Sequence, residues 1–318
     1  MSKVLDDSIY VSQNSENVWV DHSSIERFVE GHSFKEFNHW LDESPFMIKE
    51  LDERDRLHFL LTFDAVSFSY WGSPKWTVEY RGKEYDGSWA MVISLGRALE
   101  EGRDITDPNY LSSMSEEEWG LITRGNVPIP LAQDRCQNLR EIGEVLIQKY
   151  DGDFNNLVSS TDTDAVSLAD RIVDEFPCFR DSAVYKGRAV RFYKRAQVLV
   201  GDVEWMYRDV EGLEIAGTEG LTACADYKIP QMLREYGILR YSQTLAEKVD
   251  SCQEIPKCSE EETEIRSNTI VAVDLITRGL NKKNLKIRPK DVNDHLWLES
   301  QNKIQGIRPY HLTRTTAY

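Results

Sequence analysis

Residues 192–207, FYKRAQVLVGDVEWMY, are apolar around almost the whole circumference of the helix that their pattern predicts. A helix without a polar face is usually central in a fold, with other elements packed around it. The stretch nevertheless contains Lys194, Arg195 and Asp202. The spacing of Arg195 and Asp202 predicts a structural ion pair, but Lys194 needs another explanation, because burying an unpaired ammonium group is costly. Lys194 is therefore a candidate functional residue.

The rest of the chain also has a mainly helical pattern. Apolar residues at helical spacing, with Ser259 as an expected N-cap, predict helices over residues 134–150, 164–176, 242–249, 259–280 and 290–300, and FDAVSFSYW (63–71) reads as a buried helix. Alternating residues around the Gly82 and Gly187 turns predict β-hairpins over residues 76–87 and 183–193. No repeat, low-complexity tract or Gly/Ser linker interrupts the sequence, so we expect a single domain over residues 1–318.

Charge and composition exclude several classes of function. With 54 acidic and 38 basic residues, the formal net charge is −16, and such a surface repels duplex nucleic acid. No apolar stretch approaches the ~18 residues that span a membrane, and no signal-peptide pattern precedes residue 22. Five scattered cysteines and six dispersed histidines lack metal-ligand spacing. We expect a cytoplasmic monomer that binds a small molecule, without a metal or cofactor.

The segment LTACADYKIPQMLREYG (221–237) places Asp226 where an apolar stretch turns into a short helix. Aspartate is a favoured N-cap, because its oxygens accept the unpaired N–H groups of the first helical turn. The same geometry would also hold a carboxylate still at the mouth of a pocket. The residues alone leave both interpretations open.

Lys194 at the start of a central helix and Asp226 before a later one resemble the catalytic segment of helix-hairpin-helix base-excision glycosylases. In that family, a lysine or its replacement opens a buried helix and an aspartate caps the next helix. The chain departs from the pattern, because VYKGRAVRFYK (184–194) stands where those enzymes have a Gly-rich hairpin that grips DNA phosphate.

Six segments together resemble the queuosine 5′-phosphate N-glycosylase/hydrolase family of queuosine salvage proteins, in the order and at the spacing of that family. They are FDAVSFSYW (63–71), YDGSWAMVISLGRALEEG (85–102), FRDSAVYKGRAVRFYKRAQVLVGD (179–202), ADYKIPQMLREYGILRYS (225–242), EIRSNTIVAVDLI (264–276) and GIRPYHLTRTTAY (306–318). The resemblance implies a mainly α, helix-hairpin-helix glycosylase-like fold with small β-hairpins. It also implies a metal-free N-glycosidase that releases queuine from queuosine 5′-monophosphate for tRNA modification.

The resemblance assigns the catalytic carboxylate to Asp226 and places Lys194 at the same site. A fixed carboxylate suits this chemistry, because breaking a ribosyl C–N bond develops positive charge on the sugar. Asp226 would act either electrostatically or through a covalent adduct. Lys194 would either orient Asp226 or bind the phosphate, and its alternative is a structural pair with Asp226.

Further residues carry over from the family as candidates for binding the base: His39, Trp40, Asp64, Cys224, Ala225, Tyr227 and Trp297. The alternative for His39 is a histidine in a surface loop, and the alternative for Asp64 is a pair with a buried cation. HLWLES (295–300) departs from the family, because Leu298 replaces an acid there.

The tail RPYHLTRTTAY (308–318) is basic within an acidic chain. Tyr310, His311 and Arg314 are therefore candidates for binding the 5′-phosphate, since arginine offers phosphate a charge-assisted fork. The alternative is a frayed, exposed tail. Two other functions remain open for the whole chain: a DNA base-excision glycosylase, and a queuine-binding protein without catalytic activity.

Overall fold

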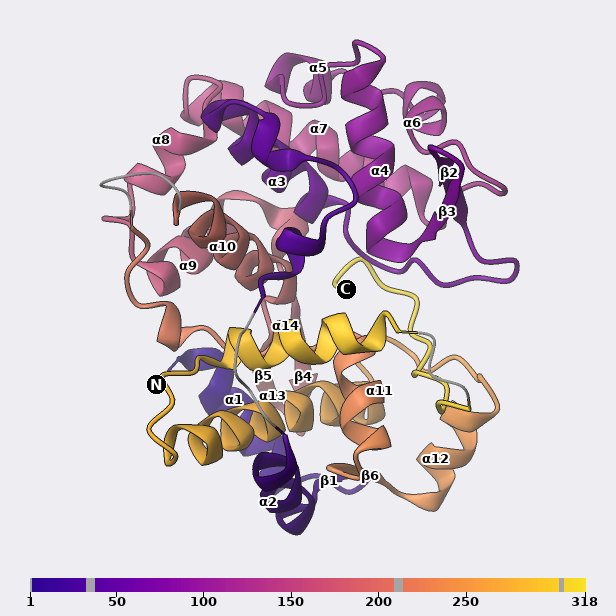
Figure 1. Ribbon diagram of the computed structural model, residues 1–318, viewed down its shortest axis with the longest axis vertical. Helices are drawn as coiled ribbons and strands as arrows, with labels where there is room; N and C mark the ends of the chain where they lie inside the picture. Colours follow the sequence, from indigo (N-terminus) through magenta and orange to yellow (C-terminus); the bar gives the residue numbers. More distant parts are fainter. Residues whose placement is uncertain (1, 33–37, 209–213, 303–305) are drawn as a thin grey trace.

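The computed structural model describes residues 2–32, 38–208, 214–302 and 306–318. These residues form a mainly helical molecule whose strands occur only as short antiparallel pairs. Two hydrophobic clusters make up most of the core, and helix α14 (Pro289–Ser300) runs across the middle between the two groups of helices (Figure 1). No helix in the described ranges is long and apolar enough to cross a membrane.

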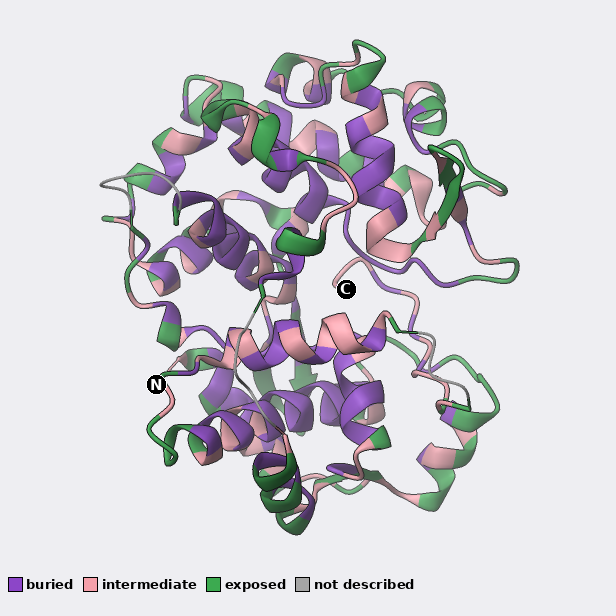
Figure 2. Ribbon diagram, in the orientation of Figure 1, coloured by how far each residue is buried: buried purple, intermediate pink, exposed green. Residues whose placement is uncertain are grey.

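The first group surrounds α10 (Lys194–Tyr207), which packs against α3 and α9. Its other elements are α3 (Glu53–Ala65), β2 (Thr77–Tyr80), β3 (Lys83–Asp86), α4 (Gly87–Glu100), α5 (Pro108–Ser112), α6 (Glu116–Ile122), α7 (Ala132–Lys149), α8 (Phe154–Ser159) and α9 (Ala165–Glu175). Four short 3₁₀ turns connect elements: η1 (Trp40–Glu43), η2 (Ile48–Glu50), η3 (Pro177–Phe179) and η4 (Thr218–Gly220). Figure 2 shows α10 as mostly buried, whereas α3 is exposed in its first turn and buried from Leu57 to Ala65.

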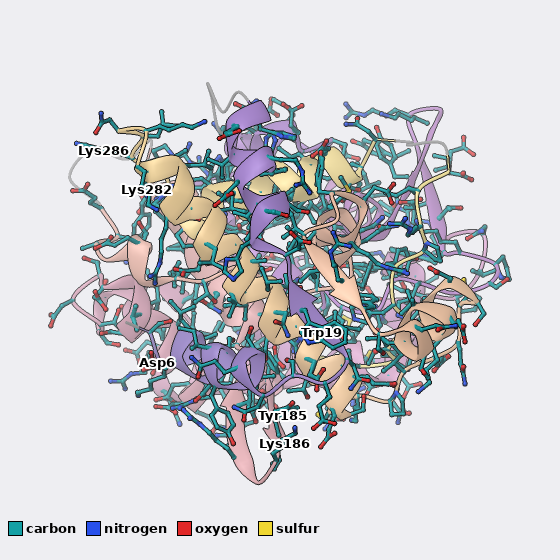
Figure 3. All side chains as sticks on the ribbon, turned by 90° about the horizontal axis from the view of Figure 1, so that it is seen from below. Asp6, Trp19, Tyr185, Lys186, Lys282 and Lys286 are labelled. Atoms are coloured by element: carbon teal, nitrogen blue, oxygen red, sulfur yellow. The ribbon has the colours of Figure 1, made fainter. Side chains whose placement is uncertain are left out.

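The second group is built on the long helix α13 (Glu260–Asn281), against which α1, α2, α11 and α14 pack. Its other elements are α1 (Lys3–Gln13), β1 (Val18–Val20), α2 (His22–Gly31), β4 (Ser182–Tyr185), β5 (Arg188–Arg191), α11 (Lys228–Glu235), β6 (Leu239–Tyr241) and α12 (Gln243–Asp250). Lys186 lies beside Tyr185 at the turn of the β4–β5 hairpin (Figure 3). Its ammonium group donates to the Asn14 carbonyl at 3.0 Å and pairs with Glu16.

The helices expected over residues 134–150, 164–176, 192–207, 242–249, 259–280 and 290–300 are confirmed, as are both hairpins. The buried helix expected over residues 63–71 is wrong beyond Ala65, where α3 ends. Residues 66–71 are buried but irregular. Asn138 donates to the Ala65 carbonyl at 2.8 Å, and Arg135 donates to the Val66 and Phe68 carbonyls. Side chains thus replace the helical hydrogen bonds that a buried backbone requires.

The expected ion pair between Arg195 and Asp202 is also wrong. Arg195 donates instead to the carbonyls of Asp64 (3.0 Å) and Ala65 (2.7 Å), and to that of Cys178. The last carbonyls of a helix have no partner within the helix, so the guanidinium group caps the end of α3. Asp202 accepts a hydrogen bond from the indole of Trp40 at 2.9 Å.

Candidate functional site

A cavity that is partly open to solvent lies between the two groups of helices, with residues of both groups in its wall. Aromatic side chains make up much of its wall: Trp40, Phe63, Phe68, Tyr70, Tyr227, Trp297, Tyr310 and Tyr318. Charged side chains also line it: Lys75, Asp86, Lys194, Asp226, Lys228, Lys290 and Asp294. The cavity therefore joins an apolar enclosure to a small set of charged groups.

Asp226 lies on the cavity wall immediately before α11. Its Oδ1 accepts hydrogen bonds from the backbone N–H groups of Lys228 (2.7 Å) and Ile229 (3.0 Å). The residue is 8% exposed. Tyr227 takes the N-cap position of α11, and the Asp226 carboxylate binds the first N–H groups of this helix from one residue earlier. Asp226 also lines the cavity.

Lys194 lines the cavity from the first turn of α10. Tyr193, in the N-cap position, has a left-handed φ of 51° and makes no side-chain cap. The missing cap comes from Asp181, whose Oδ2 accepts from the Lys194 backbone N–H at 3.1 Å. The Asp181 carboxylate therefore fixes the backbone position from which the Lys194 side chain extends.

Lys290 of α14 is a second cation on the cavity wall, and it is almost fully buried. Its ammonium group lies 2.7 Å from Asp294 Oδ2 and 2.8 Å from His39 Nε2. Burial opposes the charged form of Lys290, but Asp294 and Asp202 outweigh it and raise the pKa of this ammonium group. Burial and the Lys290 charge hold the pKa of His39 well below its usual range, so the imidazole is neutral.

Two buried acids, Asp64 and Asp202, lie behind these cations. Burial raises the pKa of both, and the charge of Asp202 raises that of Asp64 further. Neither Asp64 oxygen has a hydrogen-bond partner among the described residues. A buried, unpaired carboxyl group is favoured in its neutral form, so Asp64 keeps its proton to a higher pH than an exposed aspartate does.

This protonation predicts a pH dependence of stability. The folded chain keeps the Asp64 proton at pH values where the unfolded chain has lost it, above about 4. The free energy of unfolding should therefore fall as pH rises above about 4, until the folded chain also releases this proton. In Asp64→Asn the fall should be shallower. Urea unfolding at pH 5, 6 and 7 measures the slopes.

Asp151→Asn is the matched control, because Asp151 is an exposed aspartate in a turn. It should leave the wild-type slope unchanged. A slope for Asp64→Asn equal to that of the wild type would show that Asp64 is ionised in the folded chain.

Comparison with known proteins gives the site its context. The family model described as queuosine salvage protein matches residues 47–318. The chain belongs to the queuosine salvage protein family. It is 39% identical to a protein of Sphaerobacter thermophilus over 97% of this chain and 95% of the relative. It is 32% identical to a protein of Mus musculus over 97% and 96%. Both relatives are named queuosine 5′-phosphate N-glycosylase/hydrolase.

The structure brings four of the seven base-binding candidates to the cavity: Trp40, Cys224, Tyr227 and Trp297. Trp297 stands edge-on to Trp40, with ring centroids 5.6 Å apart. Burial raises the pKa of the Cys224 thiol to about 12, so this group is no thiolate nucleophile.

The other three base-binding candidates lie behind the cavity wall. His39 stacks on Trp205 and contacts Lys290. Asp64 is buried next to the lining residue Phe63. The Ala225 carbonyl accepts from the Arg266 guanidinium at 3.0 Å, so this residue fixes the backbone before Asp226.

The expected phosphate-binding group of the tail is not brought together. Tyr310 lines the cavity and lies beside Tyr227, with centroids 4.7 Å apart. His311 is buried against Tyr318, and burial lowers its pKa to about 3, so it carries no positive charge. The Arg314 guanidinium lies 3.6 Å from the Trp71 ring centroid and donates to the Trp71 carbonyl. The tail packs inward, with His311, Thr313, Thr315 and Tyr318 buried, which also excludes a frayed tail.

Sequence reasoning missed Lys290, Asn293 and Asp294, three lining residues on α14. Asn293 Oδ1 accepts from the Cys224 backbone N–H at 3.0 Å, so α14 also supports the segment before Asp226. The i to i+4 spacing of Lys290 and Asp294 was a usable signal. Among the described residues, no group of His, Cys, Asp and Glu side chains could hold a metal ion.

Proposed function

We propose that this chain hydrolyses the N-glycosidic bond of queuosine 5′-monophosphate and releases queuine for salvage into tRNA modification. The curated relatives that carry the name of this activity match the chain over 95%, 96% and 81% of their own length. The observation that carries the proposal is the Asp226 carboxylate, which two backbone N–H groups hold on the wall of an aromatic cavity.

Asp226 meets the main demand of the reaction. As the bond between the sugar and the base breaks, the electron pair leaves with the base nitrogen and positive charge develops on the ribose. A preorganised carboxylate stabilises that charge without reorganising at the moment of reaction. Water then adds to the sugar carbon, either directly or after a covalent adduct with Asp226, and the base nitrogen gains a proton.

The aromatic part of the cavity is the place for the base. Trp40, Phe63 and Trp297 offer an apolar enclosure for a flat ring system. Asp294, beside them, is an acid that can pair with the cationic secondary amine of queuine. Asp294 would thus supply from α14 the acid that the family has at the position of Leu298.

The 5′-phosphate belongs at the mouth, where Lys75, Lys228 and Tyr310 meet. Burial lowers the pKa of Lys228, and the nearby charge of Lys75 lowers it further. Lys75 pairs with Asp86 at 2.7 Å, so the two lysines with this acid leave a net positive charge for a phosphate dianion. A strongly hydrated phosphate also loses less solvation at a mouth than in an aromatic interior. Lys194 is then left to orient the reacting groups around Asp226.

Two lysine variants test whether Lys228 binds the phosphate while Lys194 orients the reacting groups. Lys228→Met should reduce kcat/KM for queuosine 5′-monophosphate by about 10–100-fold, as expected for a hydrogen bond to a charged group, and leave cleavage of queuosine almost unchanged. Lys194→Met should reduce cleavage of both substrates to the same extent. Chromatographic release of queuine from each substrate measures these ratios.

Lys186→Met, at the exposed hairpin turn far from the cavity, controls for loss of positive charge. A selective loss of nucleotide cleavage in Lys194→Met, with none in Lys228→Met, would reassign the phosphate to Lys194.

The proposal includes the helix-hairpin-helix glycosylase-like arrangement of α10 and α11, a single domain and a monomeric state. DNA glycosylase activity is disfavoured by the net charge of −16. A gel shift with duplex DNA at physiological salt should show no complex, because too few phosphate contacts are available.

A further inference from the structure

Arg266 of α13 connects the two elements that present Lys194 and Asp226. Its side chain is 2% exposed. Nε donates to the Ala225 carbonyl at 3.0 Å, one residue before Asp226. Nη1 and Nη2 donate to the two oxygens of Asp181 at 2.8 and 2.6 Å.

Asp181 extends this connection to the other side of the site. Its Oδ2 also accepts from the Lys194 backbone N–H at 3.1 Å, at the start of α10. Its backbone carbonyl accepts from Phe192 at 3.0 Å and from Tyr193 at 3.3 Å. The residue is 5% exposed. Two hydrogen-bonding steps therefore join the backbone at Lys194 to the backbone before Asp226.

The guanidinium group is itself tightly enclosed. It lies 3.9 Å from the ring centroid of Phe192 and 4.4 Å from that of Tyr318. Tyr318 donates to Glu262 at 2.9 Å, and its carbonyl accepts from the Ser69 backbone N–H at 2.8 Å. A planar, bidentate group held between two rings has little freedom to shift.

We infer that Arg266 and Asp181 are positioning residues, which act together as a clamp that fixes the distance between Lys194 and Asp226. The inference rests on the proposed roles of those two residues. Neither Arg266 nor Asp181 lines the cavity, so each acts through the backbone of another residue. Small displacements of reacting groups lower the reaction rate strongly. Loss of the clamp should therefore have a measurable effect on kcat.

Arg266→Lys tests the clamp, because lysine keeps the charge but cannot bond Ala225 and both Asp181 oxygens in the same geometry. We expect kcat for queuosine 5′-monophosphate to fall by about 10–100-fold, with KM within about threefold of the wild type. Hydrogen exchange should rise at the amides of residues 193–198 and 224–230, and change little elsewhere.

Arg234→Lys is the matched control. Arg234 is 8% exposed and bonds both oxygens of Asp250, at 2.7 and 3.0 Å, away from the cavity. This variant should keep kcat and the exchange of both segments near the wild type. Equal losses of kcat per folded molecule in the two variants would overturn the clamp.

Asp181→Asn provides a second route if Arg266→Lys fails to fold, and it should give the same local exchange and the same loss of kcat. Global unfolding of both variants would show a general core ion pair and overturn the inference. The exchange measurement needs no substrate, so it stands even if the wild type releases no queuine and the proposed function fails.

Discussion

Asp226→Asn should fold like the wild type and lose about 10²–10⁴-fold in turnover of queuosine 5′-monophosphate, as is usual for a single catalytic group. Asparagine is as good an N-cap as aspartate, so its carbonyl oxygen can keep the hydrogen bonds from Lys228 and Ile229. A neutral amide cannot stabilise the positive charge that develops on the ribose. Steady-state release of queuine measures the loss, and thermal unfolding checks the fold.

Asp52→Asn is the control for this substitution. Asp52 caps α3 through the Asp55 N–H at 2.9 Å, and it lies outside the cavity. Its variant should keep wild-type turnover. Near-wild-type turnover in Asp226→Asn would reduce Asp226 to a helix cap and refute the mechanism.

Gly201→Ala should have the second large effect, although glycine to alanine ordinarily favours a helix. Gly201 lies within α10, and a Cβ atom there would come 1.8 Å from Cε of Lys290. Lys290 must then move away from Asp294 and His39. We expect kcat/KM to fall by about 100-fold, together with about 1–3 kcal/mol of the free energy of unfolding from overpacking. Kinetics and urea unfolding of the same preparation measure both.

Gly120→Ala controls for the change in helix propensity, since a Cβ atom at Gly120 in α6 meets nothing within 4 Å. It should leave kcat/KM unchanged and stability equal or higher. Unaltered kinetics in Gly201→Ala would mean that the position of Lys290 does not matter for the reaction.

Much of the fold could be predicted from the sequence, because helical periodicity survives in long segments such as residues 259–280. The end of α3 could not. The apolar run through residues 63–71 is equally compatible with a buried helix and with a buried loop. Arg135 and Asn138 of α7 stabilise the loop, because their side chains donate hydrogen bonds to the carbonyls of Val66 and Ala65. They lie more than 60 positions away in the sequence.

The site shows the same limit. Asp226 and Lys194 each carried a local signal, an acid before a helix and a lysine in an apolar helix. The position of Lys290 on the cavity wall depends on a glycine on another helix and on partners brought together only by folding. Arg314 shows the converse, because a basic tail suggested phosphate binding, whereas packing against Trp71 decides where its guanidinium lies.

The most direct measurement incubates the purified chain with queuosine 5′-monophosphate in excess EDTA and separates the products by chromatography. We predict release of queuine and ribose 5-phosphate in equal amounts, at the same rate with and without EDTA, because a carboxylate and an enclosed pocket suffice for the reaction. Binding of the nucleotide without release of queuine would contradict hydrolysis and leave a queuine-binding protein. Activity lost in EDTA and restored by metal would contradict the mechanism built on Asp226.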